Sequence, residues 1–264
     1  MNPLALPFTA DEPQVITIGA EAIPALRIAP VGALGPLPCI VLQHGYGADK
    51  YDLAQIAEVT AGLGFVTILP DAWGHGERYD PTVPNFTNSF SANYFVEVVQ
   101  HVADDLGQIV ASLRQDATLD PTRMLLGGFS LGGITSIIAT ERDPAVAGVL
   151  AMAGGVAPES LEASLGMARA DPAYLQWITA HDMGAPANAA KLAPRPVLLM
   201  HGRQDDRLPV TGSVRLYEAA RLGYSSVPDR LQLRLYDATH EITMPMLADA
   251  VAWLVANFGS ETTS

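Results

Sequence analysis

Residues 124–133 read Met-Leu-Leu-Gly-Gly-Phe-Ser-Leu-Gly-Gly, and this stretch decides the fold. Its first three residues form a short apolar run of the kind found in buried strands, and helical spacing begins at Leu131. Between them, Gly128 and Gly132 flank Ser130 at two positions on either side. A strand, a sharp turn and a helix that meet at a serine lift its hydroxyl above the edge of a sheet. The pattern predicts Ser130 as a nucleophile.

A glycine-rich phosphate-binding loop is the competing interpretation of the same stretch. Such loops carry a lysine followed by serine or threonine after their glycines, and the run 127–133 contains no lysine. The nucleophile is therefore the favoured hypothesis.

Outward from Ser130, apolar runs alternate with longer segments of helical periodicity. This alternation predicts an α/β protein with a mostly parallel central sheet of about eight strands and helices on both faces. We expect one domain over residues 1–264, with a small cap insertion at about 154–194. The expected strands are 14–18, 25–29, 39–42, 65–69, 124–126, 146–152, 196–200 and 231–235, and the expected helices are 52–61, 94–114, 131–140, 214–222 and 244–258.

The composition excludes several classes of protein. Of the 264 residues, 49% are hydrophobic and 16% charged, which is typical of a chain with a packed core. The net charge of -13 disfavours nucleic acid and anionic membranes as partners. The lone Cys39 precludes an internal disulfide, and no leader or membrane-spanning run is evident, so we expect a cytoplasmic protein.

A serine nucleophile needs a base, and the chain has six histidines. His101 falls within the long predicted helix and His181 within the predicted cap. His44, His75 and His201 each precede glycine, a context in which we expect them to shape loops. His240 follows the last predicted strand, where its ring can reach over the sheet, and it is the predicted base.

The base in turn needs a carboxylate that orients its ring. The loop after the strand at 196–200 contains Asp205 and Asp206. We predict Asp205 as the acid, and Asp206 remains the adjacent alternative, with a solvated ion pair to Arg203 or Arg207 as its structural role.

Negative charge that develops on a substrate oxygen is stabilised by backbone N–H groups held in place before the reaction. The N–H of Leu131, directly after the nucleophile, is one predicted donor. The N–H of Tyr46, in the loop His44-Gly45-Tyr46-Gly47 after an apolar strand, is the other. A plain glycine turn with the Tyr46 ring as a pocket wall is the alternative for this loop.

Four segments in this order, HGYG, DAWGHGER, GFSLGG and HGRQDDRLP, together with the late His240, resemble the α/β-hydrolase superfamily over almost the whole chain. Within it, the chain is similar to the dienelactone hydrolases and the prolyl-oligopeptidase-like serine esterases. Dienelactone hydrolases use a cysteine nucleophile, whereas this chain has Ser130. Prolyl oligopeptidases are similar only in their catalytic domain.

The resemblance implies a serine esterase that acts on a small-molecule ester through an acyl-enzyme intermediate, without cofactor or metal. Peptidase and lactonase activities on the same fold are alternatives, as is a non-catalytic ligand receptor. Trp73, His75 and Trp177 are candidates for lining the substrate pocket, with Asp71 bracing its loop. For Trp73 and His75, structural bracing is the favoured alternative. The sequence does not predict the oligomeric state.

Overall fold

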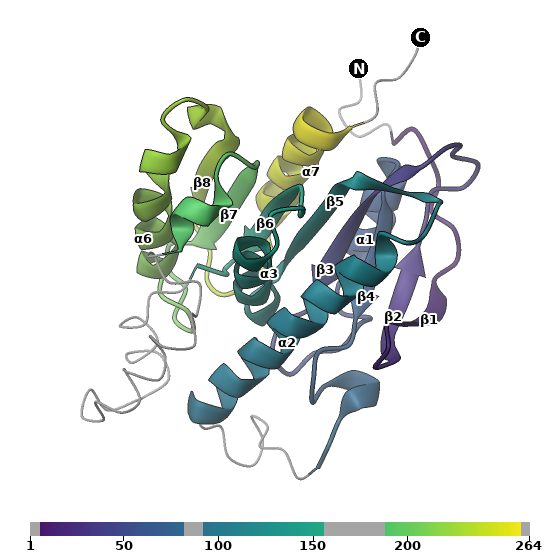
Figure 1. Ribbon diagram of the computed structural model, residues 1–264. Coiled ribbons are helices and arrows are strands. Elements are labelled where there is room, and N and C mark those ends of the chain that lie inside the picture. Colours follow the sequence, from purple (N-terminus) through teal and green to yellow (C-terminus); the bar gives the residue numbers. More distant parts are fainter. Residues whose placement is uncertain (1–5, 82–91, 156–187, 260–264) are drawn as a thin grey trace.

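The computed structural model describes residues 6–81, 92–155 and 188–259. Its centre is an eight-stranded sheet in the order β1-β2-β4-β3-β5-β6-β7-β8 (Figure 1). The first two strands pair antiparallel, β2 pairs antiparallel with β4, and all other neighbours are parallel. The prediction of a mostly parallel eight-stranded sheet is confirmed. The strands are β1 (Gln14–Ile18), β2 (Ile23–Ile28), β3 (Leu37–Gln43), β4 (Val66–Pro70), β5 (Leu119–Phe129), β6 (Gly148–Met152), β7 (Val197–Gly202) and β8 (Leu231–Tyr236).

Helices cover both faces of the sheet (Figure 1). One face packs on α1 (Ala54–Gly62) and α7 (Met244–Phe258), with Trp253 of α7 in the core. The other face packs on α2 (Ala92–Leu113), α3 (Leu131–Arg142) and α6 (Thr211–Ala220). Because helices lie on either side, the central strands are buried on both faces, which explains their continuous apolar runs.

Strand β5 begins earlier than predicted, at Leu119 instead of residue 124. After the buried Leu119, the next residues are polar. They form a turn in which the Asp120 carboxylate accepts hydrogen bonds from the Thr122 N–H and hydroxyl and from Arg123. The register against β3 shifts between Leu37 and Cys39. A polar turn built into a strand hides the apolar pattern on which the prediction depended.

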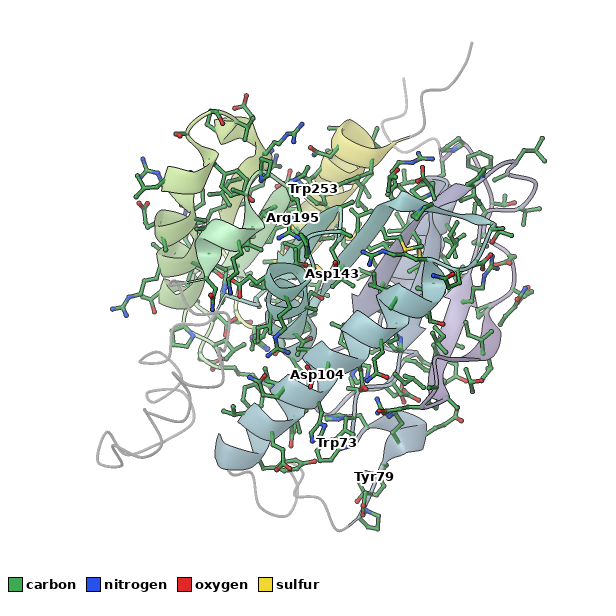
Figure 2. The ribbon with its side chains drawn as sticks, in the orientation of Figure 1. Trp73, Tyr79, Asp104, Asp143, Arg195 and Trp253 are labelled. Carbon is green, nitrogen blue, oxygen red and sulfur yellow. The ribbon has the colours of Figure 1, made fainter. Side chains whose placement is uncertain are left out.

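The predicted cap segment, 154–194, lies mostly outside the described residues. At its C-terminal end, a short 3₁₀ helix, η2 (Ala189–Leu192), is described. Ala189 and Leu192 are buried against α6, so the chain has already entered the core there. Arg195 then donates hydrogen bonds to the carbonyls of Asp143 and Val146, which ties the start of β7 to the loop after α3 (Figure 2).

All the parallel strands end at the same edge of the sheet. The loops that follow them therefore converge, and they carry the candidate residues. His44 follows β3, Asp71 follows β4, Ser130 follows β5, Asp205 follows β7 and His240 follows β8. Among the described residues, no helix is long and apolar enough to cross a membrane.

Candidate active site

Ser130 occupies the sharp turn between β5 and α3. Its backbone has φ 55° and ψ -115°, a conformation that a residue with a side chain rarely adopts. Its N–H donates to the carbonyl of Met152 at 2.9 Å, and its carbonyl accepts from the N–H of Ile134 at 3.0 Å. The turn is thus held on both sides, by β6 and by the first turn of α3.

The two glycines of the motif are required by close packing. A Cβ on Gly128 would lie 2.3 Å from the carbonyl oxygen of Gln43, and a Cβ on Gly132 would lie 1.9 Å from the same atom. Both distances are far inside van der Waals contact, so only glycine lets the start of α3 lie against the end of β3. The spacing around Ser130 has this steric cause.

Three side chains from separate loops form a continuous line of hydrogen bonds. The Ser130 hydroxyl lies 2.9 Å from His240 Nε2, and His240 Nδ1 lies 2.7 Å from Asp205 Oδ2. Since a carboxylate only accepts, Nδ1 carries the proton and Nε2 accepts from the serine. The His240 ring also packs against Phe129, with 4.8 Å between ring centroids. The tautomer of His240 with its proton on Nδ1 is the one that a general base beside a serine requires.

Asp205, not Asp206, contacts the histidine. Its other oxygen, Oδ1, accepts from the N–H groups of Arg207 at 3.0 Å and Leu208 at 2.9 Å. Burial acts to raise the pKa of Asp205, but the contacts with His201, His240 and the Leu208 N–H outweigh it and hold the pKa well below its usual range. The carboxylate therefore stays ionised at neutral pH.

The two predicted oxyanion donors belong to Leu131, directly after Ser130, and to Tyr46, in the loop after β3. Leu131 is the first residue of α3, where a backbone N–H has no partner within its own helix. Gly45 packs directly on the nucleophile, since a Cβ built on it would lie 3.7 Å from Ser130 Cβ. Tyr46 follows Gly45, and its ring lies edge-on to His75 at 4.8 Å and against Phe95 at 5.7 Å.

His44 joins the loops that follow β3 and β4. Its Nδ1–H donates to the Gly45 carbonyl at 2.8 Å, and its Nε2 accepts from the Ala72 N–H at 3.0 Å. The ring is buried, and burial lowers its pKa to about 4. His44 is therefore neutral at neutral pH, and in this form it hydrogen-bonds to the backbone of the loop that carries Tyr46.

A buried ion pair fixes the loop after β4, as predicted for Asp71. Its carboxylate lies 2.8 Å from Lys50 Nζ and accepts from the N–H groups of Lys50 and Glu77. Lys50 also contacts Glu77 at 2.6 Å. Burial acts to raise the pKa of Asp71, but the contacts with Lys50 and the Glu77 N–H lower it overall. A Cβ on Gly76 would lie 2.1 Å from the carboxylate, so the loop closes tightly around it.

The predicted pocket residues have different surroundings. His75 is buried, and its Nδ1 donates to the Trp73 carbonyl at 2.8 Å. The Trp73 ring stacks on His101 of α2, with 4.3 Å between centroids, and lies beside that helix in Figure 2. These contacts support the bracing alternative for both residues. Trp177 lies outside the described residues.

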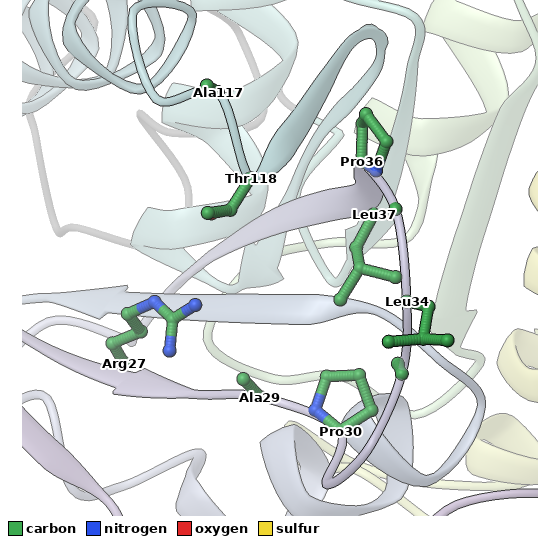
Figure 3. A pocket seen from close by; sticks show the side chains of 10 residues that line it. Arg27, Ala29, Pro30, Leu34, Pro36, Leu37, Ala117 and Thr118 are labelled. Carbon is green, nitrogen blue, oxygen red and sulfur yellow. The ribbon is translucent and has the colours of Figure 1, made fainter.

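The opposite edge of the sheet holds a cleft of about 450 Å³, shown in Figure 3. It is lined mainly by apolar side chains, with Arg27 and Thr118 as its polar members. It opens where β3 and β5 begin, whereas the triad residues follow the ends of their strands. With no histidine, cysteine or carboxylate in its wall, this cleft offers no nucleophile or base.

No group of three or more histidine, cysteine or acidic side chains within the described ranges is placed to hold a metal ion. Of the three histidines that the sequence assigned to loop shaping, two, His44 and His201, have hydrogen-bond partners at both ring nitrogens. The sequence could have indicated their importance only through their position, because each lies at the end of a buried strand. Their hydrogen bonds to other loops and elements could not be predicted from the sequence.

Comparison with known proteins identifies the family of the chain. Residues 51–261 match the family described as the prolyl oligopeptidase family. The chain belongs to this family. It is a serine hydrolase with the α/β-hydrolase fold predicted from its motifs.

Individual proteins resemble this chain over most of its length. Esterase YjfP of Escherichia coli (strain K12) is 29% identical over 205 residues, which cover 75% of this chain and 80% of that protein. The crystal structure of TT1662 from Thermus thermophilus superposes with a TM-score of 0.76 at 21% identity, covering 95% and 100% of the two chains. Acylaminoacyl peptidase of Pyrococcus horikoshii gives a TM-score of 0.70 at 15% identity, covering 97% of this chain and 43% of the peptidase.

The packing of Gly132 against β3 leads to a first prediction. Gly132→Ala should lower the free energy of unfolding by more than about 2 kcal/mol, because its Cβ would overlap the Gln43 carbonyl. Gly107→Ala is the matched control: it lies within α2 with no atom within 4 Å of the added Cβ, and it should stabilise the protein by about 0.5–1 kcal/mol. Urea unfolding measures both. Equal effects of the two substitutions would contradict the steric argument.

The depressed pKa of His44 leads to a second prediction. The unfolded chain takes up this proton near pH 6.5 and the folded chain near pH 4, so the stabilisation is complete above pH 6.5 and is lost as the pH falls. Between pH 7 and pH 5 this loss is about 2 kcal/mol. His44→Gln keeps an acceptor for Ala72 but cannot titrate, so its stability should fall by that much less over the same range. Parallel pH profiles of unfolding free energy for the two proteins would refute the assignment.

Proposed function

We propose that this chain is a carboxylesterase that cleaves small-molecule carboxylic esters through an acyl-enzyme intermediate. The observation that carries the proposal is the line of hydrogen bonds Ser130–His240–Asp205, with distances of 2.9 and 2.7 Å and with the proton on His240 Nδ1. With the proton on Nδ1, Nε2 is free to accept the proton of the serine, which the other tautomer of His240 would not allow.

In this mechanism Ser130 Oγ attacks the ester carbonyl while His240 Nε2 takes its proton. The N–H groups of Leu131 and Tyr46 stabilise the oxyanion, and His240 returns the proton to the leaving alcohol. Water then attacks the acyl-enzyme with His240 again as the base, which releases the acid and regenerates Ser130. Asp205 stays ionised and stabilises the imidazolium that forms in each step.

Two observations support esters as the substrate class. The curated relative YjfP is named an esterase and is matched over 80% of its length, so the likeness extends well beyond a shared catalytic motif. The rings of Tyr46, which is partly buried, and Phe95, which is buried, pack in the same apolar cluster as Leu131 and suit an apolar acyl group.

Peptide hydrolysis is the second candidate, because the matching family is named for oligopeptidases and a peptidase shares the fold. The same three residues would cleave an amide if His240 delivered its proton to a leaving amine. A panel of p-nitrophenyl esters of increasing acyl length, run beside aminoacyl p-nitroanilides and lactones, separates these activities. We expect the highest kcat/KM on the esters.

The catalytic assignment has a direct test. Ser130→Ala should reduce kcat on p-nitrophenyl acetate by about 10⁴-fold or more with little change in KM, because the nucleophile is lost and the binding surface remains. Ser136→Ala is a matched control, since it removes the hydroxyl of a buried serine within α3 that donates to the Gly127 carbonyl. Near-normal turnover by Ser130→Ala would overturn the proposal.

A fluorophosphonate probe distinguishes an enzyme from a receptor with the same fold. We expect the wild-type protein and Ser136→Ala to be labelled and Ser130→Ala to remain unlabelled, since the probe reacts only with an activated serine. A wild-type protein that resisted labelling would favour the receptor.

A further inference from the structure

A second histidine lies against the triad carboxylate. His201, near the end of strand β7, is completely buried. Its Nε2 lies 3.1 Å from Asp205 Oδ2 and 2.8 Å from the Leu208 carbonyl oxygen. Asp205 and Leu208 mark the beginning and the end of the acid loop, which we define as residues 205–208. One ring nitrogen therefore contacts both ends of this loop.

The surroundings determine the tautomer of His201. Both neighbours of Nε2 are acceptors, so Nε2 must carry a proton. On the other side of the ring, Nδ1 lies 2.7 Å from the hydroxyl oxygen of Ser213, in the first turn of α6. The hydroxyl can donate to Nδ1, and this hydrogen bond holds the proton on Nε2.

Ser213 is itself fixed by close packing. A Cβ built on Gly155 would lie 2.2 Å from Ser213 Cα, so the loop after β6 presses directly on the start of α6. Ser213 is also almost fully buried. Gly155, Ser213, His201 and Asp205, which form this chain of contacts, are therefore all buried.

We infer that His201 is a positioning residue for the catalytic reaction: its Nε2–H, held by Ser213, fixes the acid loop so that Asp205 Oδ2 faces His240 Nδ1. This inference rests on the proposed function. Asp205 needs such support because it lies in a loop, three residues beyond Gly202 at the end of β7. Without the contact at Nε2, Oδ2 would be held by the hydrogen bond from His240, the ring that it has to orient, and the backbone N–H groups on Oδ1 belong to the acid loop itself.

Two substitutions of His201 separate its two hydrogen bonds. The amide nitrogen of glutamine reaches the position of Nε2 and can donate to Leu208 and Asp205, whereas that of asparagine reaches only the position of Nδ1, beside Ser213. His201→Asn should lower kcat on p-nitrophenyl acetate by about 30-fold with KM nearly unchanged. His201→Gln should recover most of that loss. Equal losses in both variants, or a loss in KM alone, would overturn the inference.

A double-mutant cycle tests whether His201 acts through Asp205. We expect His201→Asn to have almost no further effect when Asp205 is already alanine, because the carboxylate that it orients is gone. The rate of fluorophosphonate labelling measures this where turnover is slow. A purely structural contribution would instead cost the same factor in both backgrounds.

Ser213→Ala keeps the test conclusive if His201→Asn does not fold. It removes only the hydroxyl that fixes the tautomer, and it should lower kcat about threefold in the wild-type background and not at all in Asp205→Ala. Ser136→Ala, another buried serine lost without contact to the acid loop, should leave kcat unchanged.

The outcomes distinguish this inference from the proposed function. If Asp205→Ala retains full activity, the proposed triad is wrong. If Asp205→Ala is inactive but His201→Asn and Ser213→Ala behave like the wild type, only the positioning role of His201 fails.

Discussion

The contact between the first turn of α3 and the end of β3 is the constraint on which the site depends. The Gln43 carbonyl lies where a Cβ on Gly128 or Gly132 would fall, so the helix can approach the sheet only because both positions are glycine. This approach gives Ser130 its rare backbone conformation and puts the N–H of Leu131 beside it. It also brings β3 and β5, neighbours in the sheet, into contact at their ends, so the loop with Tyr46 starts next to the nucleophile.

The loops around Ser130 are held mainly by buried polar groups that are fully paired. His44 ties the loop after β3 to the loop after β4, the Lys50–Asp71 pair closes the latter, and His201 spans the acid loop. A buried polar group without a partner is costly, so each pairing restricts its loop to one arrangement. The site therefore gains rigidity from hydrogen bonds that apolar packing alone would not direct.

The electrostatics of the site follow from the same pairings. Asp205 and Asp71 stay ionised despite burial because each receives several hydrogen bonds, whereas burial lowers the pKa of His44 and keeps it neutral, although its hydrogen bond to the Gly45 carbonyl acts to raise that pKa. Charge is thus retained on the carboxylate that contacts His240 and is absent from the His44 ring, beside the loop that bears the Tyr46 N–H.

The sequence by itself determined the class of fold, most strand and helix positions, and the candidates Ser130, Asp205 and His240, because hydrophobic periodicity and the glycine spacing are local signals. It did not reveal the early start of β5, where a polar turn interrupts the pattern, or the roles of His44 and His201. Only the tertiary structure decided that Asp205 and not Asp206 faces His240, and that a second histidine lies against the same carboxylate. The physical reason is that these choices depend on hydrogen bonds between loops far apart in the chain, whose directions are set when the strands align and not by any neighbouring residue.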